Sequence, residues 1–344
     1  MHQGAGQRSH WALDGVLNPL LTIIAGDIAP SDIEGLHNAL QEKNYIAIRN
    51  SQINYYKDIG LYYIEDGSFV LYKPPGKLMA DLRMREGRHP TELYIHQKDR
   101  QAAIKELQNG FNRYIARSIK TGNAVAVKST LCNLVEETLA EPRSGTLRAL
   151  PETVDVLVSG YSKNPEIIKT FASISFKDYS TVIHSVNVMA LTLGFCFYSK
   201  LSLHETKRLG LSALLHDVGK TEIPDTILKA PRKLTDKEFQ MMKRHPKIGE
   251  YIIKIKSGIG GSIARGALEH HEKLDGSGYP KGVQHISFVG QLLGIIDCYE
   301  ALTNEERPYR RAKSPLDTLK LIKTDVEAGK FDRKIFEKFC YSLI

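Results

Sequence analysis

The stretch LLHDVGK at residues 214–220 places a histidine and an aspartate directly after an apolar helical run. A second stretch, EHHEKLDGSGYP at residues 269–280, joins two adjacent histidines to a glycine-containing loop. Working outward, His184 precedes the apolar run 186–197, His245 lies in KRHPKIGE, and Asp297 follows LLGII. Five histidines and two aspartates therefore lie beside segments with helical spacing, which indicates a helical fold built around a polar centre.

This set of side chains predicts a metal centre. A single histidine on a helix is usually structural, and a single His-Asp pair is a weak signal. Mixed imidazole and carboxylate ligands suit Mn, Fe or Zn, whereas Ca and Mg prefer oxygen ligands alone. Seven ligands exceed the need of one ion, so we expect two ions bridged by a carboxylate. Asp217 is the best bridge, because its neighbour His216 can serve one ion while Asp217 reaches both.

Residues 1–100 predict a small α+β domain. A helix is expected over 32–43, and short runs of β-type residues follow it. Asp66-Gly67-Ser68 separates two of these runs and predicts a hairpin. The predicted strands are Tyr45–Arg49, Leu61–Glu65, Phe69–Lys73 and Glu92–His96.

From Gln97 onward the periodicity is helical, and we expect an all-helical bundle. The fold class is therefore mainly α, with the small α+β domain in front. We divide the chain into a domain at 1–100, a helical connecting region at 101–160 and a catalytic domain at 161–344. The expected helices are 98–120, 124–141, 145–160, 164–175, 179–199, 203–216, 235–256, 260–271, 288–303, 314–328 and 331–343.

Composition and charge narrow the class of protein. The 344 residues carry a net charge of +8; residues 1–144 hold 17 basic and 16 acidic side chains, and residues 145–344 hold 30 and 23. The basic surplus fits either a polyanionic partner such as a nucleotide or an ordinary solvated surface. Four scattered cysteines indicate reduced thiols. Without an apolar run of about 18 residues we expect no membrane span, and a cytoplasmic location.

The motifs together resemble the HD-GYP family of bacterial cyclic-di-GMP phosphodiesterases, a branch of the HD metallophosphohydrolases. HHExxDGxGYP is matched at 270–280, HDxGK at 216–220 and HPxxG at 245–249. RPYR at 307–310 and GKFD at 329–332 extend the resemblance, which covers about residues 160–344.

The resemblance implies a ligand set and a reaction. His184, His216, Asp217 and Asp297 would bind one divalent ion, and Asp217 would bridge to a second ion held by His245, His270 and His271. Some members carry a third metal with a glutamate where this chain has Ser180, so two ions are expected, of Fe or Mn, with Zn not excluded. Glu300 stands where members often have aspartate. The implied reaction converts cyclic-di-GMP to pGpG, and more slowly to GMP, through a metal-bridging hydroxide.

Further residues are candidates for catalysis and substrate binding. Lys220 lies three positions after Asp217, on the same face if the helix continues beyond residue 216, and could pair with a phosphate or simply end the helix. Tight turning at Gly278, with Tyr279 and Pro280 beside it, offers a wall for a guanine or a packing contact. Arg307 and Arg310 could hold phosphate oxygens or lie on a solvated loop.

Other interpretations remain open at this stage. The substrate could be another cyclic dinucleotide, or a nucleotide cleaved by a plain HD phosphohydrolase, although the complete GYP motif argues against the latter. The domain could also be a catalytically weak module that binds a cyclic dinucleotide or a partner protein. Residues 1–100 could bind a regulatory partner or ligand, or act as a structural cap, and a homodimer is left open.

Overall fold

The computed structural model of the chain describes residues 44–50, 52–79, 90–140, 146–162, 170, 180–304 and 312–344. The chain forms two compact units, and the second unit includes residues 51–57 and 101–344. Residues 52–57 join it through contacts with two helices: the Tyr55 and Phe111 rings lie 4.3 Å apart, and Gln52 Nε2 donates to Glu137. The expected helices at 32–43 and 164–175 lie outside the described residues, except for residue 170.

The first unit contains the predicted antiparallel sheet. Its four strands are β1 (Tyr45–Ile48), β2 (Leu61–Glu65), β3 (Ser68–Lys73) and β4 (Leu93–His96), in the order β1-β4-β2-β3. Asp66 and Gly67 form the β2–β3 turn with φ of 48° and 75°. Two positive φ values at the turn centre are what a tight hairpin requires, so the Asp-Gly pair explains this connection.

The second unit is the expected helical bundle. Its described helices of nine or more residues agree with the predicted ranges to within a few positions. They are α4 (Arg100–Lys120), α5 (Ala124–Ala140), α6 (Leu150–Tyr161), α8 (Thr181–Tyr198), α9 (Leu203–Leu215), α13 (Gly261–Glu269), α14 (Phe288–Thr303), α15 (Pro315–Glu327) and α16 (Arg333–Ser342).

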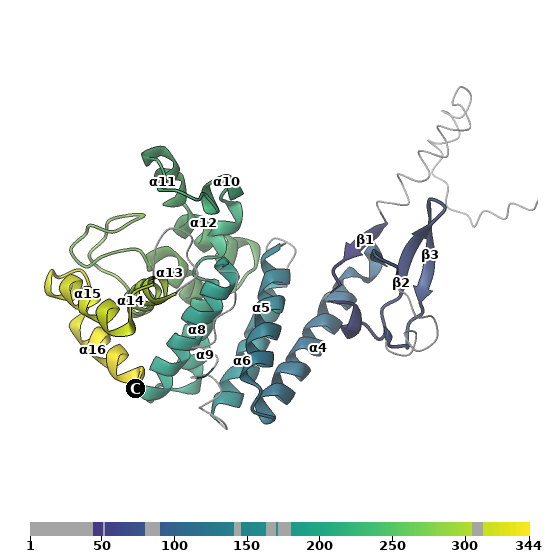
Figure 1. The fold of residues 1–344 in the computed structure, drawn as a ribbon, viewed down its shortest axis with the longest axis horizontal. Coiled ribbons are helices and arrows are strands. Elements are labelled where there is room, and N and C mark those ends of the chain that lie inside the picture. Colours follow the sequence, from purple (N-terminus) through teal and green to yellow (C-terminus); the bar gives the residue numbers. More distant parts are fainter. Residues whose placement is uncertain are drawn as a thin grey trace, which may run out of the picture. The chain divides into compact units, whose positions relative to one another are not determined.

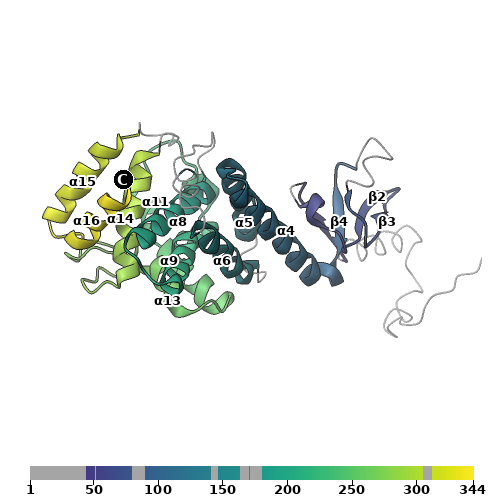
Figure 2. The ribbon, with the colours of Figure 1, turned by 90° about the horizontal axis from the view of Figure 1, so that it is seen from below.

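The core of the second unit is built around α8. This helix packs against α5, α9, α14 and α16, and Figures 1 and 2 show it between these neighbours. Among the described helices, only α8 is long and apolar enough to cross a membrane, but 61% of it is buried inside the fold. Its packing explains its apolar composition without a membrane.

The prediction of one helix over 235–256 is wrong. The structure has α11 (Asp236–Met242), then α12 (His245–Tyr251) and a π-helical turn (Ile252–Lys256). Pro246 has no N–H to donate to the Met242 carbonyl, so a continuous helix loses a hydrogen bond here. His245 Nδ1 lies 2.8 Å from that carbonyl oxygen instead, so the break in the helix also orients a histidine of the site.

Candidate metal centre

The two carboxylate oxygens of Asp217 face two different groups of histidines. Oδ2 lies 3.5 Å from His184 Nε2 and 3.4 Å from His216 Nε2. Oδ1 lies 3.2 Å from His245 Nε2 and 3.7 Å from His270 Nε2. All of these side chains are buried. Asp217 therefore has the position expected of a bridging carboxylate.

Asp297 also spans both groups. Its Oδ1 lies 3.0 Å from His184 Nε2, and its Oδ2 lies 3.9 Å from His271 Nδ1. The five histidines and two aspartates come from α8, α12, α14 and the ends of α9 and α13. The structure thus brings all seven predicted ligands together. The second span, by Asp297, was not anticipated from the sequence.

The tautomers of three histidines can be assigned from their hydrogen bonds. His216 Nδ1 lies 2.7 Å from Ala213 O, His245 Nδ1 2.8 Å from Met242 O, and His270 Nδ1 2.9 Å from Ala267 O. A carbonyl oxygen only accepts, so each Nδ1 carries the proton and each neutral ring keeps a lone pair on Nε2. These three lone pairs point into the centre.

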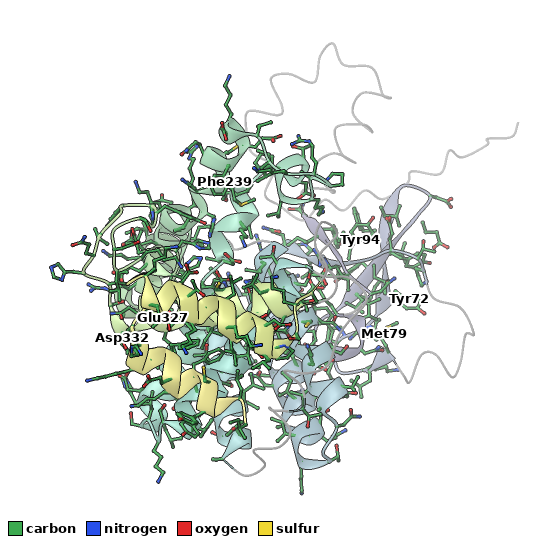
Figure 3. The ribbon with its side chains drawn as sticks, turned by 60° about the vertical axis from the view of Figure 1, so that its left-hand side comes forward. Tyr72, Met79, Tyr94, Phe239, Glu327 and Asp332 are labelled. Atoms are coloured by element: carbon green, nitrogen blue, oxygen red, sulfur yellow. The ribbon has the colours of Figure 1, made fainter. Side chains whose placement is uncertain are left out.

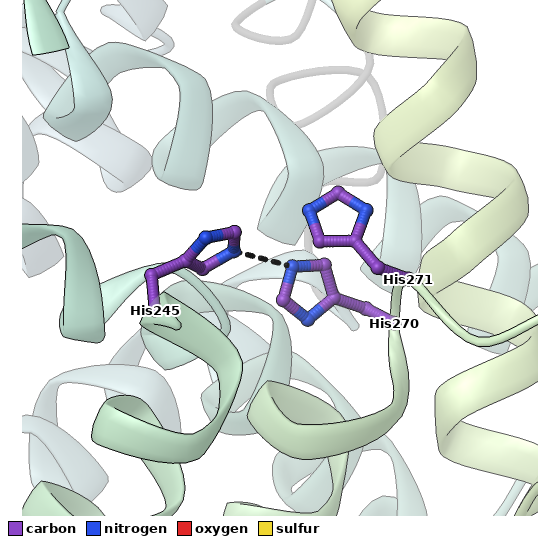
Figure 4. Close-up of side chains that lie close together, drawn as sticks. All are labelled: His245, His270 and His271. Carbon is purple, nitrogen blue, oxygen red and sulfur yellow. Dashed lines mark hydrogen bonds between the residues drawn. The ribbon is translucent and has the colours of Figure 1, made fainter. Parts of the chain in front are cut away.

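Figure 4 shows His245, His270 and His271 gathered into one of the two groups. The Nε2 atoms of His245 and His270 lie 3.3 Å apart, as do those of His184 and His216. His184, His216 and Asp217 form the second group. With their Nδ1 protons committed to carbonyls, the neutral forms of His245 and His270 have no proton to share between the two Nε2 atoms, and a metal ion can accept both lone pairs.

The charges of the site also favour cations. Burial opposes ionisation of Asp217, but Lys220 and His216 hold its pKa well below the usual range. For His184, burial opposes protonation, yet the Glu300 and Asp297 carboxylates raise the pKa to about 9. Burial and neighbouring histidines hold the pKa of His270 well below its usual range. Ionised carboxylates beside the neutral imidazole of His270 are in the forms that bind metal ions, and an ion bound at His184 would displace the proton from its Nε2.

One buried atom supports binding of divalent metal ions at this centre. Asp217 Oδ1 is buried and accepts no hydrogen bond from any described residue. A buried carboxylate oxygen without a donor is costly unless a cation compensates it. Together with the converging Nε2 lone pairs, this atom marks the centre as a site for metal ions with mixed nitrogen and oxygen ligands.

Glu300 orients the first histidine of the site. His184 Nδ1 lies 2.5 Å from Glu300 Oε2, while Asn187 Nδ2 and Asn304 Nδ2 donate to Oε1 at 2.7 and 2.9 Å. The sequence marked Glu300 only as a change from aspartate. Its carboxylate supports the tautomer of His184 that presents Nε2 to Asp217 and Asp297.

We expect Glu300→Gln to lower metal affinity by about 10–100-fold, the usual effect of losing a partner behind a ligand. The amide keeps the volume but removes the negative charge beside His184 Nδ1. Titration with a metal-competing chelator measures the change. Glu205→Gln, at a half-buried glutamate outside the centre that pairs with Arg208, is the matched control. Equal affinities in the two variants would show that Glu300 does not position the ligand.

Lys220 differs from its predicted setting. α9 ends at Leu215, close to the predicted end at residue 216, and Val218–Glu222 is a 3-10 helix, so the α-helix does not continue to Lys220. In a 3-10 helix residues three apart are aligned, and Lys220 Nζ lies 2.5 Å from Asp217 Oδ2. The Lys220 side chain is 21% exposed, so it lies at the edge of the buried centre.

The loop that carries the GYP residues is held from inside. The buried Glu272 carboxylate accepts hydrogen bonds from the backbone N–H groups of Lys281 and Val283 at 2.7 and 3.2 Å. A Cβ on Gly278 would lie 2.4–2.5 Å from backbone atoms of His271, Glu272 and Lys273. Close backbone approach therefore explains Gly278.

Tyr279 covers one of the histidines. Its ring stacks on His271 with centroids 4.5 Å apart, and its N–H donates to the His271 carbonyl at 3.1 Å. The Tyr279–Pro280 peptide bond is cis. The predicted aromatic wall thus lies directly against the metal centre. Arg307 and Arg310, the other predicted substrate contacts, lie outside the described residues.

A family model described as the HD domain matches residues 163–335. The chain belongs to this family of HD domain proteins. With its complete histidine and GYP motifs, it falls within the HD-GYP branch.

Curated relatives share this half of the chain. A cyclic di-GMP phosphodiesterase of Pseudomonas aeruginosa is 31% identical over 190 residues, which are 55% of this chain and 45% of the relative. A 3'3'-cGAMP-specific phosphodiesterase of Vibrio cholerae is 33% identical over 163 residues, 47% of this chain and 37% of the relative. A cyclic di-GMP phosphodiesterase of Vibrio cholerae is 31% identical over 265 residues, which are 72% of this chain and 50% of the relative. The chain spans half or less of the length of these relatives.

One solved structure is similar in fold. It is an HDG"Y"P protein from Bdellovibrio bacteriovorus, with a TM-score of 0.59 and 18% identity over 86% of this chain and 98% of that one. At this identity the likeness concerns the fold alone, and it agrees with the predicted helical architecture.

Proposed function

We propose that the chain is a metal-dependent phosphodiesterase that hydrolyses one phosphodiester bond of cyclic-di-GMP to give linear pGpG. The observation that carries this proposal is Asp217, whose two oxygens face separate histidine groups. The names of relatives that align with this half of the chain point to cyclic dinucleotides as the substrate class.

In this proposal His184, His216, Asp217 and Asp297 hold one ion, and His245, His270 and His271 hold the other with Asp217 shared. Bound ions would supply a nucleophilic water at neutral pH and neutralise charge on the phosphoryl oxygens. Lys220 lies beside Asp217 and would orient a non-bridging phosphate oxygen. Arg307 and Arg310 would capture the dianionic substrate. His271 and Tyr279 would form one wall of the site.

A panel of cyclic dinucleotides tests the substrate. Cyclic-di-GMP, 3'3'-cGAMP and cyclic-di-AMP are incubated with the metal-loaded chain, and products are separated by anion-exchange chromatography. We expect cyclic-di-GMP to be cleaved with the highest kcat/KM and pGpG to accumulate before GMP. If 3'3'-cGAMP is cleaved with the highest kcat/KM, the proposed substrate is wrong, but the proposed metal-dependent hydrolysis stands. No cleavage of any of the three would overturn the proposal.

We expect two divalent ions per chain, of Fe or Mn. Ser180, which stands where a third-metal glutamate occurs in some members, caps α8 by accepting a hydrogen bond from Ile183 N–H. Elemental analysis of anaerobically purified protein measures the count. A chelator should lower Tm, because ions that bind only the folded chain stabilise it. Three tightly held ions would contradict the ligand set, and a single ion would remove the bridging role of Asp217.

For residues 1–100 we propose a regulatory role. The described part of this unit is a small sheet that contributes no member to the histidine and carboxylate groups of the centre. Deletion of residues 1–100, with turnover of the shortened and the full chain compared in the presence and absence of cell extract fractions, would test whether this region modulates activity.

A further inference from the structure

An exposed aromatic side chain stands next to the wall of the metal centre. Phe239 lies on α11 and is 43% exposed; it is labelled in Figure 3. Its ring centroid is 6.5 Å from that of Tyr279, which in turn stacks on His271. A line of three rings therefore leads from a predicted metal ligand to the surface.

A lysine lies over the outer two rings. Lys243 Nζ is 4.9 Å from the Phe239 centroid and 5.5 Å from the Tyr279 centroid. Within the described part of the chain no carboxylate lies within ion-pair distance of this half-buried ammonium, whereas Lys220, Lys229 and Arg232 each have one. Among the described residues Lys243 thus has no carboxylate partner, and its three N–H donors can serve a bound ligand.

The short helix that carries Phe239 is fixed at its start. Thr235 and Glu238 form a capping box, and both oxygens of Glu238 accept hydrogen bonds from the Arg232 guanidinium, at 2.7 and 2.8 Å. These contacts hold α11 in place although none of its residues is buried. The apolar ring is thus presented to solvent on a fixed support, as is typical of a stacking surface for a ligand.

We propose that Phe239, Lys243 and Tyr279 form a guanine subsite beside the metal centre, which rests on the proposed function. The base stacks on Phe239, and Lys243 donates to the N7 and O6 acceptors of the guanine edge. Adenine replaces O6 with an amino donor, so a lysine there favours guanine. The line of rings connects this subsite to the centre where the phosphodiester is cleaved. Phe239 thus acts in binding, and Lys243 acts in base discrimination.

Replacement of the ring tests the stacking step. Phe239→Ala should raise KM for cyclic-di-GMP by about tenfold or more, the effect of losing one stacked base. The loss in kcat/KM should be at least about five times larger than the loss on bis(p-nitrophenyl) phosphate, which has no base. Phe239→Trp should restore KM. Met241→Ala, at another exposed apolar residue of α11, is the matched control. Equal losses on both substrates would mean that Phe239 only supports the loop.

Replacement of the charge tests the discrimination step. Lys243→Met keeps the length of the side chain and should raise the inhibition constant of GMP about tenfold while that of AMP changes less. Lys237→Met, at an exposed lysine of the same helix, is the control. If GMP and AMP respond alike, Lys243 does not recognise the base. If the wild-type chain cleaves and binds no cyclic dinucleotide, the proposed function fails and the subsite with it. If it cleaves cyclic-di-GMP and both variants match their controls, only the subsite is wrong.

Discussion

Asp217→Ala should abolish turnover while the fold persists. The change removes the one side chain whose two oxygens face both histidine groups, so neither ion would keep its place. We expect kcat to fall by about 10³-fold or more, which corresponds to about 4 kcal/mol of transition-state stabilisation. Far-UV circular dichroism should change little, because Asp217 contacts polar groups and removes no apolar core contact.

The matched control for this prediction is Asp225→Ala. Asp225 also pairs with a lysine, Lys229, at 2.7 Å, but its side chain is 72% exposed. Turnover, metal content and Tm are measured for both variants. Asp225→Ala should behave as wild type, since an exposed pair of this kind contributes little. Activity near that of wild type in an Asp217→Ala sample of verified metal content would contradict the proposed mechanism.

The seven candidate ligands could be singled out from the sequence because most of them lie in short motifs. His216 and Asp217 are adjacent, as are His270 and His271, and the apolar runs beside them indicated helices. The ranges of α8, α9, α13 and α14 follow from the 3.6-residue period, which is local information. The prediction that polar side chains gather at the ends of these helices therefore used local patterns alone.

The residues behind the ligands could not be assigned in the same way. Glu300 contacts His184 from 116 positions away, and no local pattern encodes that pairing. Its carboxylate is one carbon longer than that of the aspartate expected from the family resemblance, and the sequence alone did not reveal its partner. The helix break at Arg244 likewise arises because Pro246 has no backbone N–H. The helical periodicity continues through residues 235–256, so it does not reveal this break.

The aromatic line from His271 to Phe239 was missed for a similar reason. Tyr279 was singled out by its motif, but Phe239 lies 40 positions earlier in a segment first interpreted as one long helix. Only when that helix is divided does α11 present Phe239 and Lys243 toward the loop. Contacts between motif and non-motif residues therefore required the structure.

Gly219 of the HDxGK motif lies against the backbone of the HPxxG motif at 245–249. Gly219→Ala should disturb this close contact and the position of His245. A Cβ at residue 219 would lie 2.0 Å from the His245 carbonyl oxygen and 2.6 Å from the Gly249 nitrogen. Both atoms belong to the backbone, so no rotamer change relieves the clash. The 3-10 helix that follows Asp217 and α12 must move apart, which displaces His245 from Asp217.

We expect Gly219→Ala to lower the free energy of unfolding by about 3 kcal/mol, at the upper end of overpacking effects. The ion held by His245, His270 and His271 should be lost first, because only this group contains a ligand from α12.

Gly194→Ala is the control, since a Cβ at this position of α8 meets nothing within 4 Å. There alanine should be neutral or stabilising by about 0.5–1 kcal/mol through its helix propensity. Chemical denaturation with parallel metal analysis separates the two effects, and unchanged stability and full metal content in Gly219→Ala would show that the backbone contact does not position His245.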